Sequence, residues 1–213
     1  FGSGHELYIF RQPDSEYCVP GDINLDGKLD ENDLTSYMNY TGLRKDDGDF
    51  DYVSKGDLNG NGLLDAYDIM AVAVALNDGV SPGKIAPVAG EVSIKADKVQ
   101  YNAGDIASIT ISGKGLQSVN GLSLALPYNA QNWEYVGVEA PVLAGMYNMT
   151  YDRLHTNGDK VLYPTFVNLG EKRNIKGDTA LMVVKMKSKK KQKFTLKHTD
   201  GMLVDKQQNV AKF

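Results

Sequence analysis

Two stretches of the chain place an acidic or amide side chain at nearly every second position around a central glycine. The first reads GDINLDGKLDEND (residues 21–33), and the second, 35 residues later, reads GDLNGNGLLDAYD (residues 56–68). Apolar residues at helical spacing follow each stretch. A single acidic turn would need no further explanation, because Asp, Asn and Gly are common turn residues. Repetition with the same spacing indicates that both stretches meet one chemical requirement.

The spacing matches that of a calcium-binding loop. Calcium takes six to eight oxygen ligands, and a twelve-residue loop supplies them from positions 1, 3, 5, 7, 9 and 12, with glycine at position 6 for the sharp turn. Gly27 and Gly62 occupy position 6. We therefore expect the chain to bind two Ca²⁺ ions. The predicted ligands are Asp22, Asn24, Asp26, the carbonyl of Lys28, Asp30 and Asp33 in the first loop, and Asp57, Asn59, Asn61, the carbonyl of Leu63, Asp65 and Asp68 in the second.

The two predicted loops differ in charge. The first carries four carboxylates and the second three, so the first is expected to bind calcium more tightly, because ligand charge tunes affinity. Position 8 is leucine in both loops, Leu29 and Leu64, which predicts that the loops lie side by side and bury these residues between them. Without the ions the crowded carboxylates repel one another, and the segment is expected to be loose or unfolded.

A third acidic stretch, DDGDFD (residues 46–51), lies between the loops. It has no glycine at the matching offset, so it is interpreted as a solvated connector, with a further cation site as the alternative. Cys18 is the single cysteine, so it has no partner for a disulfide within the chain.

The hydrophobic period changes from helical to two after a stretch rich in Gly and Pro, NDGVSPGKIAPVAG (residues 77–90). Eight or nine short alternating segments follow without an intervening helical pattern, which predicts a β-sandwich of jelly-roll type. The predicted strand segments are EVSIKADKVQ (91–100), IASITISGKG (106–115), GLSLALPY (121–128), WEYVGVEA (133–140), KVLYPTFVN (160–168), ALMVVKMKSK (180–189), KFTLKHTD (193–200) and NVAKF (209–213). The residues predicted to point inward are Val92, Ile94, Ile109, Ile111, Leu122, Leu124, Leu126, Val136, Val138, Leu162, Phe166, Leu181, Val183, Phe194 and Leu196.

The predicted organisation has two domains. A small all-α calcium-binding module of paired loop–helix units occupies residues 20–79, a linker residues 80–90, and an all-β jelly-roll sandwich residues 91–213. Residues 1–19 are interpreted as the β-strand tail of an upstream domain or as residues foreign to the natural chain, because HELYIFRQ alternates like a strand.

Both parts are similar to known families. The duplicated motif, GDINLDGKLDENDLTSYMNY and GDLNGNGLLDAYDIMAVAVAL, resembles a dockerin module, with Asp in place of Glu at position 12 and a helix after each loop but none obvious before it. Residues 91–213, from VSIKADKVQYNAGDIASITISGKG to DGMLVDKQQNVAKF, are similar to a cohesin domain. Cohesins are jelly-roll sandwiches that bind dockerins, and many carbohydrate-binding modules share their sandwich.

The resemblance implies calcium-dependent protein–protein adhesion in the non-catalytic tail of a larger secreted bacterial glycoside hydrolase. The implied partner is a cohesin or dockerin module of the same or another chain, and the implied location is secreted, periplasmic or on the cell surface. Dockerin recognition depends on positions 10 and 11 of each loop. The two halves differ there, which argues against a symmetric dual binding mode. The implied partner-binding residues are Glu31, Asn32, Ala66 and Tyr67.

Sugar binding by the sandwich is the alternative function, with the dockerin-like part as a spacer. Flat aromatic faces stack on sugar rings, although a tryptophan in an alternating strand also suits a core. The candidate aromatic residues are Trp133, Tyr135, Tyr147, Tyr151 and Tyr163.

Other function classes find little support. His5, His155 and His198 have no neighbours at ligand or triad spacing, so we expect no catalytic site in this chain. A net charge of −4 gives no reason to bind nucleic acid or an anionic membrane. No apolar run approaches the roughly 18 residues of a membrane span.

Overall fold

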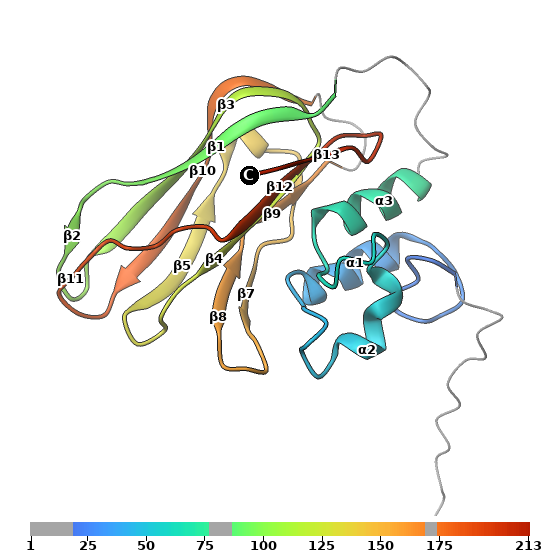
Figure 1. Cartoon of the computed structure of the whole chain (residues 1–213), viewed down its shortest axis with the longest axis horizontal. Helices are drawn as coiled ribbons and strands as arrows, with labels where there is room; N and C mark the ends of the chain where they lie inside the picture. The colour runs from blue at the N-terminus through green and yellow to red at the C-terminus, as the bar shows by residue number, and fades with distance from the viewer. Residues whose placement is uncertain (1–18, 77–86, 169–173) are drawn as a thin grey trace, which may run out of the picture.

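The computed structural model describes residues 19–76, 87–168 and 174–213. A helical segment (residues 19–76) precedes a β-sandwich (residues 87–213), and Figure 1 shows the helices gathered against one side of the sandwich. The expectations for the N-terminal tail and for most of the linker lie outside the described residues, as do His5 and Cys18.

The helical segment holds α1 (Glu31–Tyr40), α2 (Phe50–Val53) with a 3₁₀ turn after it (Ser54–Gly56), and α3 (Ala66–Leu76). The strands are β1 (Ala89–Ala96), β2 (Gln100–Tyr101), β3 (Ile106–Val119), β4 (Gly121–Pro127), β5 (Trp133–Glu139), β6 (Tyr147–Asn148), β7 (Tyr151–Leu154), β8 (Lys160–Tyr163), β9 (Thr165–Val167), β10 (Ile175–Ser188), β11 (Gln192–Lys193), β12 (Asp200–Val204) and β13 (Val210–Lys212).

Both predicted helices are present, and each begins at position 10 of its loop. Helix α1 starts with a capping box. The side chain of Asp30 accepts a hydrogen bond from a backbone N–H of the first turn, and the side chain of Asp33 accepts one from the backbone N–H of Asp30. Helix α3 has almost no polar face, and seven of its eleven residues are buried. A helix that is apolar nearly all round must be covered on more than one side.

Two sheets form the sandwich. One sheet has the order β1-β3-β10-β5, and the other has the order β13-β12-β4-β8-β7, with β9 joining β4 and β6. All the strand pairs are antiparallel. The core between the sheets includes Trp133, with Tyr101 and Phe194 in edge-to-face contact around it. The predicted sandwich is confirmed.

Two of the predicted inward residues point the wrong way. Val136 is 54% exposed, and Val183 is only partly buried, whereas Val184 is fully buried. The pairing register shifts on β5 at Val136 and on β10 at Leu181, so each strand holds an extra residue at that point. A β-bulge reverses the phase of alternation beyond it, and a strict period of two therefore fails there.

Strand prediction was also wrong near the C-terminus. The segment KFTLKHTD (residues 193–200) was expected to be a strand, yet between Lys193 and Asp200 the chain is irregular. The strand is instead β12, which was not predicted. The hairpin of β7 and β8 likewise includes an unpredicted first strand.

The helical segment and the sandwich share a hydrophobic core. Helix α3 contacts β4, β9 and β12. The cluster around it joins residues of the helical segment, such as Ile69 and Met70, to Met149, Val167, Met202 and Val204 on the outer face of the second sheet. The sequence left open whether the two parts touch; in the structure they pack against each other.

Candidate functional site

The first acidic loop is closed by hydrogen bonds from its own backbone. Asp22, at position 1, accepts from the N–H groups of Asp26 (3.1 Å) and Gly27 (2.8 Å). Asp33, at position 12, accepts from Ile23 (3.0 Å) and Asp30 (2.9 Å). Position 6 has φ +87°, a left-handed conformation that requires glycine in practice.

The second loop repeats this arrangement at an offset of 35 residues. Asp57 accepts from Asn61 (3.1 Å) and Gly62 (2.8 Å), and Asp68 accepts from Leu58 (2.8 Å) and Asp65 (2.9 Å). Gly62 has φ +79°. In both loops the side chain at position 3 accepts a hydrogen bond from the backbone N–H of position 5. The side chain at position 5 likewise accepts one from the N–H of position 7. The duplicated sequence therefore folds into a duplicated structure.

Buried carboxylates accumulate in these loops. Asp33 and Asp68 have no exposed surface, and Asp22 and Asp65 are also buried. Burial, with the negative charge of Asp65, raises the pKa of Asp68 to about 8, and burial raises the pKa of Asp65 to about 6. No salt bridge in the described residues involves a carboxylate of either loop. Within the described part of the chain, these carboxyl groups therefore have no basic side chain paired with them.

The donor set of each loop fits a hard cation. Carboxylate, amide and backbone oxygens are the ligands that calcium takes, and a divalent ion would balance the buried charge. Within the part of the chain that the structure describes, no group of three or more Asp, Glu, His or Cys side chains is placed to hold a metal ion. In the structure these carboxylates instead accept hydrogen bonds from backbone N–H groups of their own loops. Calcium binding stays a prediction.

Leu29 packs against the hydrophobic cluster that contains Leu64, so the position-8 residues of the two loops lie in one core. Leu64 is fully buried and exchanges backbone hydrogen bonds with the Gly42–Leu43 segment (2.8 and 3.0 Å), while Leu29 is only partly buried. The isolated β-bridge of the second loop joins Leu63 to Arg44. The segment that follows α1 is therefore the backbone hydrogen-bond partner of the second loop at this point.

The predicted partner-binding positions have different surroundings. Glu31 and Asn32, at the start of α1, are exposed. Ala66 is fully buried, and the hydroxyl of Tyr67 lies 3.3 Å from the side-chain oxygen of Gln208, in the turn between β12 and β13. Position 11 of the second loop thus contacts the sandwich of the same chain, whereas positions 10 and 11 of the first loop are exposed.

Two glycines allow the helical segment to approach the sandwich closely. A side chain at Gly121 on β4 would meet the Cγ of Met70 at 2.9 Å, so Met70 fills the space above this glycine. On the other side of the contact, Gly42 lies directly against the ring of Tyr163 on β8. The helical segment thus packs Met70 against a glycine of the sandwich, and the sandwich packs Tyr163 against a glycine of the helical segment.

A buried polar cluster joins the same two surfaces. His155 follows β7; its Nδ1 lies 2.7 Å from Oδ2 of Asp47, and its Nε2 lies 2.9 Å from the hydroxyl of Tyr163. The backbone N–H groups of Arg44 and Thr156 also donate to Asp47, each at 2.9 Å. All three side chains of the cluster are buried.

Asp47 belongs to the acidic stretch that was interpreted as a solvated connector, and for this residue the interpretation was wrong. Asp46, Asp49 and Asp51 are exposed as expected. The partner of Asp47 is 108 residues away in the chain, and neither residue lies in a periodic pattern, so no local signal identified the contact. His155, which has no neighbour at ligand or triad spacing in the sequence, is buried in this cluster.

Arg153 adds a second polar contact. Its Nε and Nη2 donate to the backbone carbonyls of Thr41 (3.0 Å) and Asn39 (2.7 Å), at the C-terminal end of α1. Helix α1 has no basic residue of its own in its last turn. The guanidinium thus satisfies carbonyls at the negative end of the helix and ties them to β7.

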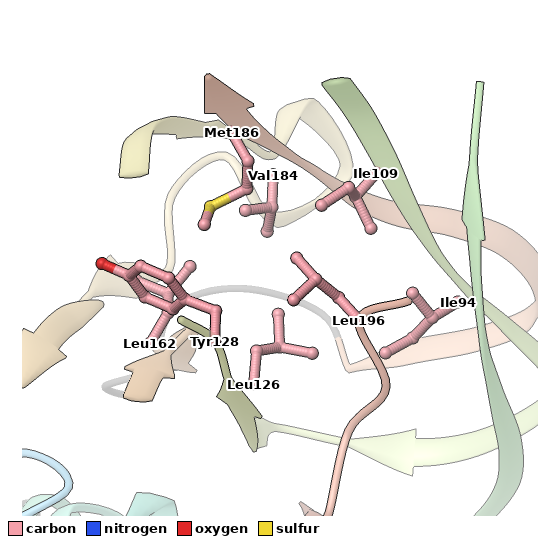
Figure 2. A pocket seen from close by; sticks show the side chains of 8 residues that line it. All are labelled: Ile94, Ile109, Leu126, Tyr128, Leu162, Val184, Met186 and Leu196. Carbon is pink, nitrogen blue, oxygen red and sulfur yellow. The ribbon is translucent and has the colours of Figure 1, made fainter. Parts of the chain in front are cut away.

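The aromatic residues considered for sugar stacking do not form one exposed surface. Trp133 and Tyr163 are only 2% and 3% exposed, whereas Tyr147 is 56% exposed. The pocket in Figure 2 lies inside the sandwich, where aliphatic side chains from both sheets point toward one another around Leu196. Its single hydroxyl, of Tyr128, donates to Asp152. This lining offers no polar groups that converge on a sugar.

Comparison with known proteins returned structural matches only. The chain is similar to cohesin modules. A type II cohesin domain from the cellulosome of Acetivibrio cellulolyticus has a TM-score of 0.46 at 16% identity and aligns over 57% of this chain and 87% of its own. The cohesin module of a Clostridium perfringens family 33 glycoside hydrolase has a TM-score of 0.43 at 18% identity, over 60% and 95%.

A chain from a type II cohesin–X–dockerin complex of Acetivibrio cellulolyticus has a TM-score of 0.46 at 12% identity, over 58% of this chain and 91% of its own. No family model and no curated protein matches the sequence. The resemblance of residues 20–79 to a dockerin, and the division into two domains, stay predictions. No described helix is long and apolar enough to cross a lipid bilayer.

Proposed function

We propose that this chain is a non-catalytic, calcium-dependent adhesion unit in which a dockerin-like segment binds a cohesin-like sandwich of the same chain. The observation that carries the proposal is the repeated hydrogen-bond arrangement of the two acidic loops, together with the packing of the helix that follows the second loop on the sandwich. The unit would belong to the tail of a larger secreted carbohydrate-active enzyme of a bacterium.

Calcium would supply positive charge to carboxylates that are otherwise buried together. The residues of the chain hold the loops in place: Asp22 and Asp57 bind the turn at position 6, and Asp33 and Asp68 connect the start of each loop to the helix after it. Asp68 also lies in the first turn of α3, the helix that packs on the sandwich. An ion bound to Asp68 would therefore fix the N-terminal end of this helix. Metal binding in such loops contributes directly to folding.

Adhesion within one chain follows from the contact surface. Ala66 and Met70 of α3 are buried, and Tyr67 contacts Gln208 of the sandwich. The covered sheet face is therefore not free to bind another chain while the helical segment lies on it. The exposed residues at the start of α1, Glu31 and Asn32, are the part of the predicted partner surface that a second chain would meet.

The test is calcium titration of the whole chain by calorimetry, followed by thermal unfolding in calcium and in chelator. We expect two bound Ca²⁺ ions and a higher unfolding temperature in calcium. Asp22→Ala combined with Asp57→Ala should abolish both effects. Asp105→Ala, just before β3, combined with Asp178→Ala, on β10, should leave calcium binding unchanged. A wild-type chain that takes up no calcium, with the same unfolding temperature in both buffers, would contradict the proposal.

A further inference from the structure

The chain separates its charges between its two parts. Residues 19–76 hold twelve Asp and Glu side chains against four Lys and Arg, whereas residues 87–213 hold eleven against seventeen. The net charge of −4 therefore describes neither part, and the sandwich is basic. Because attraction of a charged partner depends on where charge is clustered, the net charge is no guide to what the sandwich binds.

Five lysines gather at the end of the sandwich that lies away from the helices. This end is formed by β2 and β11, which pair with each other and lie at the opposite end of the molecule from the helices in Figure 1. A turn after Ser188 connects β10 to β11. The five residues, here called the lysine tip, are all exposed: Lys98, Lys189, Lys190, Lys191 and Lys193.

Hydrogen bonds fix the turn that carries three of these lysines. Ser188 is fully buried; its hydroxyl donates to the carbonyl of Lys190 (2.7 Å), and its N–H donates to the carbonyl of Asp105 (2.8 Å). Nε2 of Gln192 donates to the carbonyl of Asn132 (2.8 Å) and to Oγ of Ser188 (2.7 Å). A turn held in this way loses little conformational entropy when its side chains bind a partner.

The lysines of the tip are not paired with carboxylates. In the described part of the chain, no salt bridge involves any of the five. The carboxylate of Asp97, next to Lys98 in the sequence, accepts a hydrogen bond from the hydroxyl of Tyr101 (2.7 Å) instead. Nζ of Lys189 donates to the backbone carbonyl of Ala130 (2.9 Å). Exposed, clustered positive charge of this kind attracts polyanions.

The side chains at the tip favour one class of polyanion. Every basic residue of the tip is a lysine, a compact point charge, whereas arginine provides the planar fork that binds a phosphate through two hydrogen bonds. The rings packed below the tip, Tyr101 and Trp133, are only 0% and 2% exposed and cannot stack on nucleic-acid bases. Val99 adds one exposed apolar side chain. A valine is a far smaller anchor than a lipid chain, which by itself binds a membrane only weakly.

We propose that the lysine tip binds an anionic polysaccharide, through the carboxylate or sulfate groups along the polymer. A polymer with repeated single charges contacts several lysines at once, and the release of its counterions favours binding. The inference goes beyond the proposed adhesion function. The tip lies at the other end of the molecule from the acidic loops, so its binding does not depend on calcium.

The test is calorimetry of the whole chain with heparin, a sulfated polysaccharide, and with polygalacturonate, a carboxylated one. Low salt and a chelator are used, so that calcium cannot bridge the polymer to the acidic loops. We expect the chain to bind at least one of the two polymers, with an affinity that falls steeply as salt is added. Lys190→Gln combined with Lys191→Gln and Lys193→Gln should weaken binding roughly tenfold to hundredfold and flatten its salt dependence.

The matched control combines Lys114→Gln, Lys176→Gln and Lys212→Gln, which remove the same charge from exposed lysines outside the tip. It should bind nearly as well as the wild type, and both triple variants should keep the wild-type unfolding temperature because all six side chains are exposed. Equal losses of affinity in the two variants, or a wild type that binds neither polysaccharide, would overturn the inference. Tighter binding to a single-stranded oligonucleotide or to phosphatidylglycerol vesicles than to either polysaccharide would overturn it as well.

Discussion

Nδ1 of His155 lies 2.7 Å from Oδ2 of Asp47, and this contact joins the sandwich to the helical segment across 108 residues of sequence. Burial by itself would raise the pKa of Asp47. Hydrogen bonds from the N–H groups of Arg44 and Thr156, and from His155, outweigh burial and hold that pKa below its ordinary value. The contact therefore stabilises the ionised form of Asp47.

The first prediction concerns acid stability. A carboxyl group with a lowered pKa in the folded state stabilises the protein above its ordinary pKa and loses this effect as the pH falls through the lowered value. Asp47→Asn should reduce the free energy of unfolding by about 1–3 kcal/mol at neutral pH and flatten its decline below about pH 4. Denaturant unfolding at several pH values measures both. Asp46→Asn, at an exposed neighbour, is the control, and equal pH profiles for wild type and Asp47→Asn would refute the assignment.

The second prediction concerns the space above Gly121. Gly121→Val puts methyl groups where Met70 lies and should cost about 1–3 kcal/mol of stability. Gly137→Val, on β5, is the control, because a side chain there meets no atom within 4 Å. Thermal unfolding compares them, and small-angle scattering should show the Gly121 variant expanded as the helical segment leaves the sandwich. Equal stability of the two variants would contradict the packing of Met70 on this glycine.

The third prediction concerns Arg153. Arg153→Ala removes two hydrogen bonds to the end of α1 and should destabilise the chain by about 1–3 kcal/mol. Lys189→Ala removes one exposed hydrogen bond, to the carbonyl of Ala130, and should cost much less. Chemical denaturation distinguishes them. An Arg153 variant as stable as the Lys189 variant would show that the contact contributes little.

The fourth prediction uses the duplication itself. At position 4 both loops are left-handed, with φ 63° at Leu25 and φ 68° at Gly60. Leucine is strained in this region by about 1–2 kcal/mol, and Leu25 is 43% exposed, so its side chain contributes little burial. Leu25→Gly should leave the free energy of unfolding unchanged or raise it by up to about 1 kcal/mol. The substitution relieves the backbone strain, but glycine also increases the conformational entropy of the unfolded chain, which offsets part of that gain.

The reciprocal change, Gly60→Leu, should reduce the free energy of unfolding by about 1 kcal/mol. Both variants are measured by denaturant unfolding in the same buffer as the wild type. A stabilised Gly60→Leu protein would show that the two loops do not share a backbone conformation.

The sequence alone determined the features that depend on residues close together in the chain. Each acidic loop holds all its predicted ligands within twelve residues, and the requirement for glycine at position 6 is local, so Gly27 and Gly62 have the expected left-handed backbone. The helices after the loops and most strands of the sandwich follow from short hydrophobic periods for the same reason.

Only the tertiary structure decided what depends on distant residues. Alternation predicted the direction of Val136 wrongly, because a bulge on β5 follows from its pairing with β10 and not from its own composition. The apolar sequence of α3 indicated burial but not the partner, since an apolar surface has no preferred direction. The contact of Asp47 with His155, and the packing of Leu63 against Ala125, Val161 and Tyr163, arise only when the sandwich and the helical segment are packed together.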